Sequence, residues 1–70
     1  MMELLIIKAK GGYYRFKDGS YLPCELNKAS VFPLDRVEEA RKLCATLHRD
    51  GIAEASLKKL TIIEEPYLEE

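Results

Sequence analysis

One stretch of this 70-residue chain carries a helical repeat of apolar side chains. They recur at spacings of three and four, which at about 100° per residue places them on one stripe of a helix. The stripe consists of Val37, Ala40, Leu43, Cys44 and Leu47. Asp35 is a suitable N-cap, Glu38 follows it as in a capping box, and Gly51 stands where a left-handed residue often ends a helix. The pattern therefore predicts one long helix over about residues 35–50.

Short runs rich in Leu, Ile, Tyr and Val, separated by turn residues, are typical of strands. Gly11-Gly12 and Asp18-Gly19 are hairpin signals, and the second suits a type I′ turn. Pro23 is expected to end the third strand, because proline has no N–H to donate to a sheet. The expected strands cover residues 3–10, 13–17, 20–22, 29–32 and 57–65.

This order of elements predicts an α+β fold, in which an antiparallel sheet of three to five strands carries one amphipathic helix on one face. We expect a single domain over residues 1–65 and an acidic C-terminal tail over residues 66–70. The expected core consists of Leu5, Ile7, Tyr14, Phe16, Val31, Phe32, Val37, Ala40, Leu43, Cys44, Leu47, Leu60 and Ile62.

Size and charge narrow the range of functions. A chain this short has a marginal core and often relies on a metal, a disulfide or a partner subunit. Its net charge of -1 gives no overall attraction to nucleic acid or to an anionic membrane. The apolar run at residues 4–7 is too short for a signal peptide or a membrane span. We therefore expect a cytoplasmic protein with no membrane association, whose two cysteines are reduced.

The strongest candidates for metal binding or catalysis are Cys44 and His48, whose i,i+4 spacing places them on one side of the helix. Cys24 would be a third metal ligand if its loop folded back. A structural zinc site needs four ligands, and no fourth Cys or His exists in the sequence. A catalytic thiol needs an exposed, electropositive setting, whereas Cys44 lies on the apolar stripe. We accordingly predict no metal, no cofactor and no enzymatic activity.

The first hairpin combines basic and aromatic side chains. Tyrosines beside cations are typical of sheet surfaces that stack the bases of single-stranded nucleic acid. A solvated charged face with tyrosines packed at strand ends is the alternative interpretation, and no RNA-recognition-motif signature is present. The side chains concerned are Lys8, Lys10, Tyr13, Tyr14, Arg15, Lys17 and Tyr21.

The first strand is unusually apolar for so small a protein. One helix covers one side of a sheet, so Leu4 and Ile6 need a separate cover if they point away from it. A second copy of the chain would provide that cover and give a homodimer. Loops, or the tail residues Tyr67 and Leu68, are the alternative cover, and the sequence leaves both open. The expected interaction surface comprises Leu4, Ile6, Lys8, Lys10, Tyr13, Arg15, Lys17 and Tyr21.

Two short motifs are similar to those of small uncharacterised phage and bacterial proteins. They are the run at residues 12–16 and the segment at residues 29–33, which precedes Glu38-Glu39-Ala40. The resemblance implies a strand hairpin, an A-x-x-F strand, a helix and a final strand, together with an accessory role. We therefore predict a non-enzymatic module that acts through protein contacts with a partner or a second copy. Nucleic-acid binding through the hairpin at residues 8–21 is the alternative.

Overall fold

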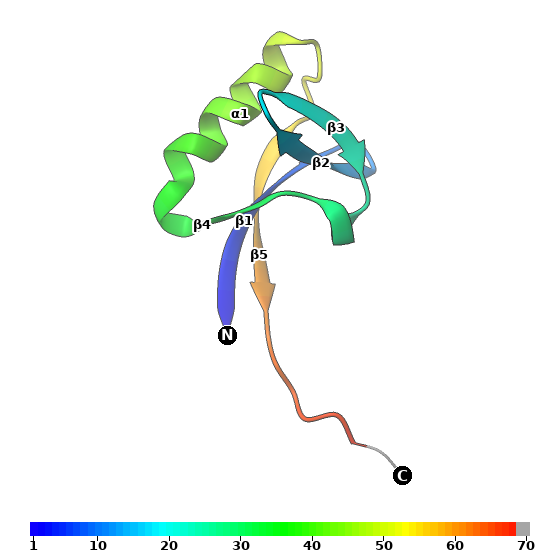
Figure 1. The fold of residues 1–70 in the computed structure, drawn as a ribbon, viewed down its shortest axis with the longest axis vertical. Coiled ribbons are helices and arrows are strands. Elements are labelled where there is room, and N and C mark those ends of the chain that lie inside the picture. The colour runs from blue at the N-terminus through cyan, green and yellow to red at the C-terminus, as the bar shows by residue number, and fades with distance from the viewer. Residues whose placement is uncertain (69–70) are drawn as a thin grey trace.

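The computed structural model of the protein describes residues 1–68. In this part of the chain, one α-helix lies against a five-stranded antiparallel sheet, which confirms the α+β fold (Figure 1). Two 3-10 turns, Leu26–Lys28 and Leu34–Arg36, flank the fourth strand. The main elements are β1 (Met2–Ala9), β2 (Gly12–Lys17), β3 (Ser20–Cys24), β4 (Val31–Pro33), α1 (Val37–Arg49) and β5 (Ser56–Ile62).

Strand β1 is the centre of the sheet. Along one edge it pairs with β5 over nearly its whole length, from Met2 opposite Ile62 to Lys8 opposite Ser56. Its other edge is shared by two strands, because β2 pairs with its last residues and β4 with residues 4–6. The N-terminal half of β1 and the C-terminal half of β5 extend beyond α1, as Figure 1 shows.

The β2–β3 hairpin closes through the turn that the sequence predicts. Asp18 and Gly19 have φ values of 50° and 79°, and a type I′ turn requires positive φ at both positions. The prediction that Pro23 ends the third strand is wrong, since β3 runs on to Cys24. Proline is tolerated there because β3 is an edge strand of the sheet and its outer side needs no donor.

The helix begins later than its sequence signals suggest. A 3-10 turn takes up Asp35, and Arg36 occupies the N-cap position with no side-chain hydrogen bond. The predicted capping box is therefore wrong, and the Glu38 carboxylate instead pairs with Arg41 one turn further on. The C-terminal prediction is confirmed, because Gly51 follows the helix with φ at 97°.

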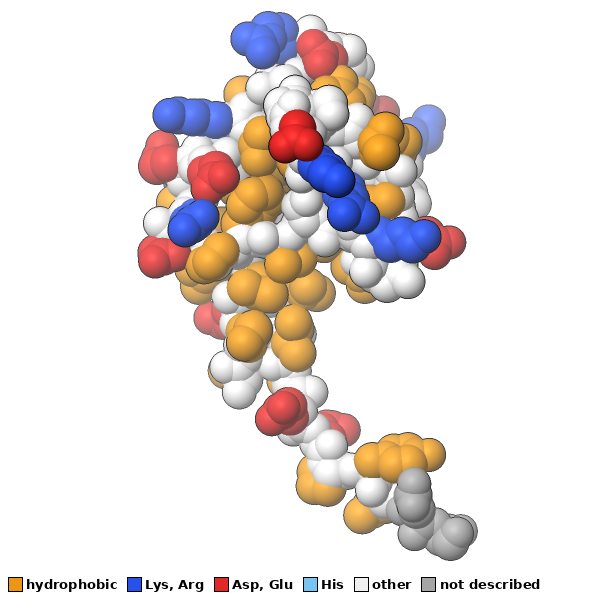
Figure 2. Space-filling model, viewed as in Figure 1, with side chains coloured by type: hydrophobic (Ala, Val, Ile, Leu, Met, Phe, Trp, Pro, Cys, Tyr) orange, Lys and Arg blue, Asp and Glu red, His pale blue; other side chains and the backbone are white. Residues whose placement is uncertain are grey.

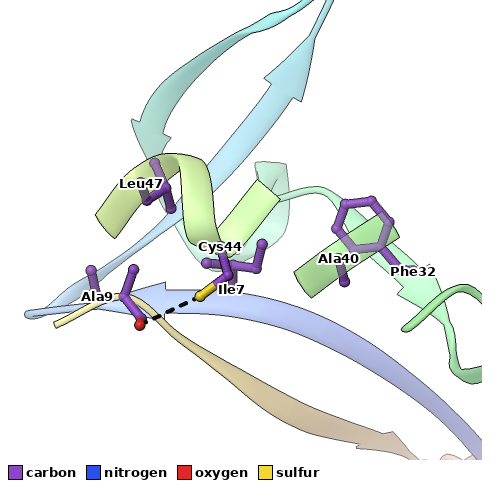
Figure 3. Packing of buried hydrophobic residues seen from close by; sticks show 7 residues of the cluster. Ile7, Ala9, Phe32, Ala40, Cys44 and Leu47 are labelled. Carbon is purple, nitrogen blue, oxygen red and sulfur yellow. Dashed lines mark hydrogen bonds between the residues drawn. The ribbon is translucent and has the colours of Figure 1, made fainter. Parts of the chain in front are cut away.

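The core lies between α1 and the side of the sheet that faces it (Figure 3). Ile7 from β1 and Leu47 from α1 are fully buried, and Phe32 from β4 closes the cluster near the start of the helix. Aromatic rings of the hairpin pack beside this cluster: Phe16 lies 6.3 Å from Phe32 between ring centroids. The hairpin thus curls toward the helix and shares its core.

Four predicted core residues lie outside the core cluster: Val31, Val37, Leu60 and Ile62. Val37 and Leu60 are half-buried, and Leu60 projects to the sheet face away from α1. Val31 and Ile62 are exposed, because the register turns both side chains to the sheet face away from α1. Ala9 and Ala55 are buried instead. Within residues 1–68, no helix has the length and apolar character required to span a membrane.

Candidate functional site

The sheet face that α1 leaves uncovered is the candidate site, and strand register defines its members. Directly opposed residues of an antiparallel pair project to the same face, and successive residues alternate between faces. Leu5, Ile7 and Phe32 belong to the core beneath the helix, so their strand neighbours project to the other side. We call this other side the open face.

One half of the open face is apolar. Leu4 lies opposite Leu60 on one side and Pro33 on the other, and Met2 lies opposite Ile62. Met2 is 57% exposed, Val31 is 43% exposed and Ile62 is 42% exposed. In Figure 2, hydrophobic side chains gather where β1 and β5 run beyond the helix. This apolar half consists of Met2, Leu4, Val31, Pro33, Leu60 and Ile62.

The other half of the open face is basic. Lys8 and Lys58 project there from β1 and β5, while Arg15 and Lys17 project there from β2. Across the strands of residues 1–68, no Asp or Glu occupies an open-face position, although the chain contains 12 acidic residues. Those acids lie on the helix side, in turns and in the C-terminal segment. The net charge of -1 thus conceals a group of strand positions that carry only positive charge, although Glu54 and Asp18 lie beside them in neighbouring turns.

A cation–π contact orders part of the basic half. The Lys8 ammonium nitrogen lies 5.4 Å from the centroid of the Tyr13 ring, and the two residues are opposed in the β1–β2 ladder. The electron-rich face of Tyr13 is therefore already occupied by a cation. A nucleic-acid base would have to displace Lys8 from the ring before stacking on it.

The sequence-predicted surface residues do not all lie on the open face. The open face includes Leu4, Lys8, Tyr13, Arg15 and Lys17, as the strand register shows. Ile6 projects to the same face but is only 2% exposed, so it is covered within the monomer and is not a contact residue. Lys10 lies in the turn after β1.

Tyr21 does not share the open face. It pairs with Phe16, and its ring packs edge-on against Tyr14 at 5.8 Å between centroids. Its hydroxyl donates a hydrogen bond to Asp50 Oδ2 at 2.7 Å. Tyr21 is therefore part of the contact between the hairpin and the end of the helix. Sequence reasoning missed Lys58, Leu60 and Ile62, whose alternate spacing was a visible signal of one shared strand face.

Cys44 and His48 are brought together, but as a structural contact. Their Sγ and Nε2 atoms are 3.9 Å apart, and both point at the Ala55 carbonyl oxygen. His48 Nε2 donates to that oxygen at 2.6 Å, and the Cys44 thiol donates to it at 3.5 Å, the bond dashed in Figure 3. Burial raises the pKa of the Cys44 thiol above its ordinary value. This arrangement ties the loop before β5 to α1 and keeps the thiol protonated.

Cys24 is not part of this contact. It lies opposite Tyr13 and so projects to the open face, on the other side of the sheet from Cys44. Among residues 1–68, no three His, Cys, Asp or Glu side chains lie close enough together to hold a metal ion.

A cleft of about 510 Å³ separates the β2–β3 hairpin from α1. Its apolar walls come from Phe16, Phe32 and Leu43. Its rim carries charges of both signs, with Lys17 and Arg49 beside Glu39. Because these charges oppose one another, the cleft favours no single class of charged ligand. The strand positions of the open face, in contrast, carry charges of one sign only.

Comparison of the chain with protein-family models, with curated protein sequences and with solved structures finds no match. The resemblance to small phage and bacterial proteins therefore has no support beyond the short motifs that suggested it. The function must be argued from the open face itself.

Proposed function

We propose that this chain is a non-enzymatic binding module whose open face recognises an acidic, apolar segment of protein. The observation that carries the proposal is the division of one sheet face into an exposed apolar half and a basic half whose strand positions include no acidic residue. Exposed apolar side chains in a contiguous group favour protein contacts. The neighbouring cations would fix the orientation of a partner that carries carboxylates and would accelerate its association.

The chemistry of the remaining residues supports a role without catalysis. The Cys44 thiol is buried and hydrogen-bonded to a carbonyl oxygen, which disfavours the thiolate form that a nucleophile requires. The Nε2 atom of His48 is engaged with the same carbonyl oxygen. Both residues thus serve to hold the loop at Ala55.

Nucleic-acid binding is the second candidate, favoured by the cluster of Lys8, Arg15 and Lys17 beside Tyr13. It ranks lower for two reasons. Lys8 already covers the Tyr13 ring, and Tyr21 is held on the helix side by Asp50. The basic half therefore offers phosphate contacts with little aromatic surface for stacking.

Amide chemical-shift mapping tests both candidates on the full, ¹⁵N-labelled chain. The first probe is a 12-residue peptide that alternates Glu with Leu or Tyr, its matched control has Lys in place of Glu, and the second probe is a 12-nucleotide oligothymidylate. We expect the acidic peptide to shift amides of β1, β4 and β5, and the basic peptide to shift none. Equal shifts with both peptides, or shifts confined to α1, would reject the proposal. Binding of the oligonucleotide alone, weakening steeply with salt, would establish the second candidate instead.

A further inference from the structure

The segment that follows β5 has the chemistry that the open face requires. Ile63, Tyr67 and Leu68 are exposed, the last two at 86% each. Glu64 and Glu65 lie between them in the sequence. The segment leaves the end of β5 and points away from the rest of the molecule (Figure 1). An acidic, apolar stretch is therefore attached directly to a protein whose sheet face is basic and apolar.

Resting on the proposed function, we infer that the occupant of the open face is the segment Ile63–Leu68 of a second copy of this chain, exchanged reciprocally in a two-fold dimer. Tyr67 and Leu68 would cover the apolar half, and Glu64 and Glu65 would pair with Lys8 and Lys58. A two-fold arrangement is self-consistent, because each copy donates one segment and receives one.

Reach explains why Glu64 and Glu65 would serve the basic half of a neighbouring copy and not the basic half of their own sheet. Lys8 lies level with Ser56, so six residues of β5, or about 20 Å, separate it from Ile62. Glu64 and Glu65 are only two and three residues beyond Ile62. A chain reversal itself consumes about two residues, so these carboxylates cannot come back along the strand to Lys8. A second copy has no such restriction.

The opposite charges of the acidic segment and the basic half would favour the exchanged dimer over a dimer of two bare faces. The open face has no acidic strand position within residues 1–68, so a carboxylate approaching it meets attraction at every basic site. The basic half repels the basic half of another copy, since the strand positions of both are positive. A dimer that places two basic halves together is therefore disfavoured, whereas the acidic segments would neutralise them.

Sedimentation equilibrium of the full chain over a hundredfold concentration range, with two charge-reversed variants, tests the exchange. One variant is Glu64→Lys/Glu65→Lys, and the other is Lys8→Glu/Lys58→Glu. We expect the wild type to dimerise and each variant alone to dimerise at least tenfold more weakly, because like charges then meet. An equimolar mixture of the two should recover the dimer, since the reversed segment of one variant meets the reversed sheet of the other and the remaining pair keeps the wild-type charges. Lys42→Glu/Arg49→Glu, on exposed helix positions, is the matched control and should dimerise as the wild type does.

The outcomes separate this inference from the proposed function. Far-ultraviolet circular dichroism of every variant verifies that it is folded. A wild type that stays at the 8.0 kDa monomer mass, or variants whose mixture fails to recover the dimer, would overturn the exchange. If the monomer nevertheless binds the acidic peptide on its open face, the proposed function stands with a different protein as partner. If neither dimer nor peptide binding is found, both proposals are wrong.

Discussion

The Tyr21 hydroxyl donates a hydrogen bond to Asp50 across 29 residues of sequence, and this bond joins strand β3 to the residue that ends helix α1. Together with the packing of Phe16 against Phe32, it holds the β2–β3 hairpin against the helix side of the sheet. The curl of the hairpin has a consequence for the candidate site, because it turns Arg15 and Lys17 outward onto the open face.

Titration of Tyr21 should report this bond. The hydrogen bond to Asp50 raises the pKa of the Tyr21 phenol above its ordinary value, followed by smaller effects of burial and of the Asp50 charge. Asp50→Asn should lower that pKa toward the ordinary value, as followed by NMR of ¹³Cζ-labelled tyrosine. Because the folded pKa is the higher one, the contribution to stability is complete below the ordinary pKa and is lost as pH rises through the folded pKa.

Leu47→Ala should destabilise the fold by about 2–5 kcal/mol, because it removes a fully buried side chain and leaves a cavity between α1 and β1. Urea unfolding followed by circular dichroism measures the loss, which is a large fraction of the stability of a small domain. Leu22→Ala is the matched control, since that side chain is 65% exposed. Its effect should stay within about 0.5 kcal/mol. Equal losses for the two variants would contradict the packing described above.

The two cysteines should differ in reactivity toward a disulfide reagent such as Ellman's. Cys44 is buried, and its pKa is raised by that burial, so little thiolate is available at neutral pH. Cys24 is half-buried on the open face and should react first. Reaction of Cys44 should await unfolding, so adding urea should bring the rates together. The reaction should therefore have a fast and a slow phase, which the variants Cys24→Ser and Cys44→Ala assign to the two thiols. A fast phase that survives in Cys24→Ser would show that Cys44 is accessible.

The sequence predicted the fold class because its signals are local. A 3.6-residue repeat identified the helix, and Asp18-Gly19 identified the hairpin whose positive φ values the structure shows. Helix capping was predicted wrongly because Asp35 has the right chemistry in either a cap or a 3-10 turn, and Pro33 just before it favours an extended entry. The side-chain pattern does not distinguish those two backbone courses.

The candidate site was only partly predictable, because the faces of a sheet depend on register between distant strands. Lys8 and Arg15 were recognised from the hairpin, whereas Lys58 joins them only through the pairing of β5 with β1. The same pairing brings Ile62 beside Met2 and exposes both. Tyr21 was wrongly assigned to the surface, because nothing in its local sequence indicates the distant hydrogen bond to Asp50.

The turn that places Tyr13 opposite Lys8 offers a test within one glycine pair. Gly11 has φ at 75°, a region in which a side chain costs roughly 1–2 kcal/mol, although no atom would touch an added Cβ. Gly12 has no such φ, and a Cβ there would lie 3.8 Å from the Cys24 carbonyl oxygen, an ordinary contact. Gly11→Ala should therefore destabilise the fold by about 1 kcal/mol relative to Gly12→Ala in urea unfolding. Because Gly12 follows the turn and pairs with Ala9, a shifted turn would also misalign the Lys8–Tyr13 pair. The Tyr13 ring should shift the NMR signals of the Lys8 side chain, and we expect Gly11→Ala to lose this ring-current shift and Gly12→Ala to keep it. That result would show that the backbone conformation at Gly11 sets the geometry of the basic half. Equal behaviour of the two variants would show that it does not.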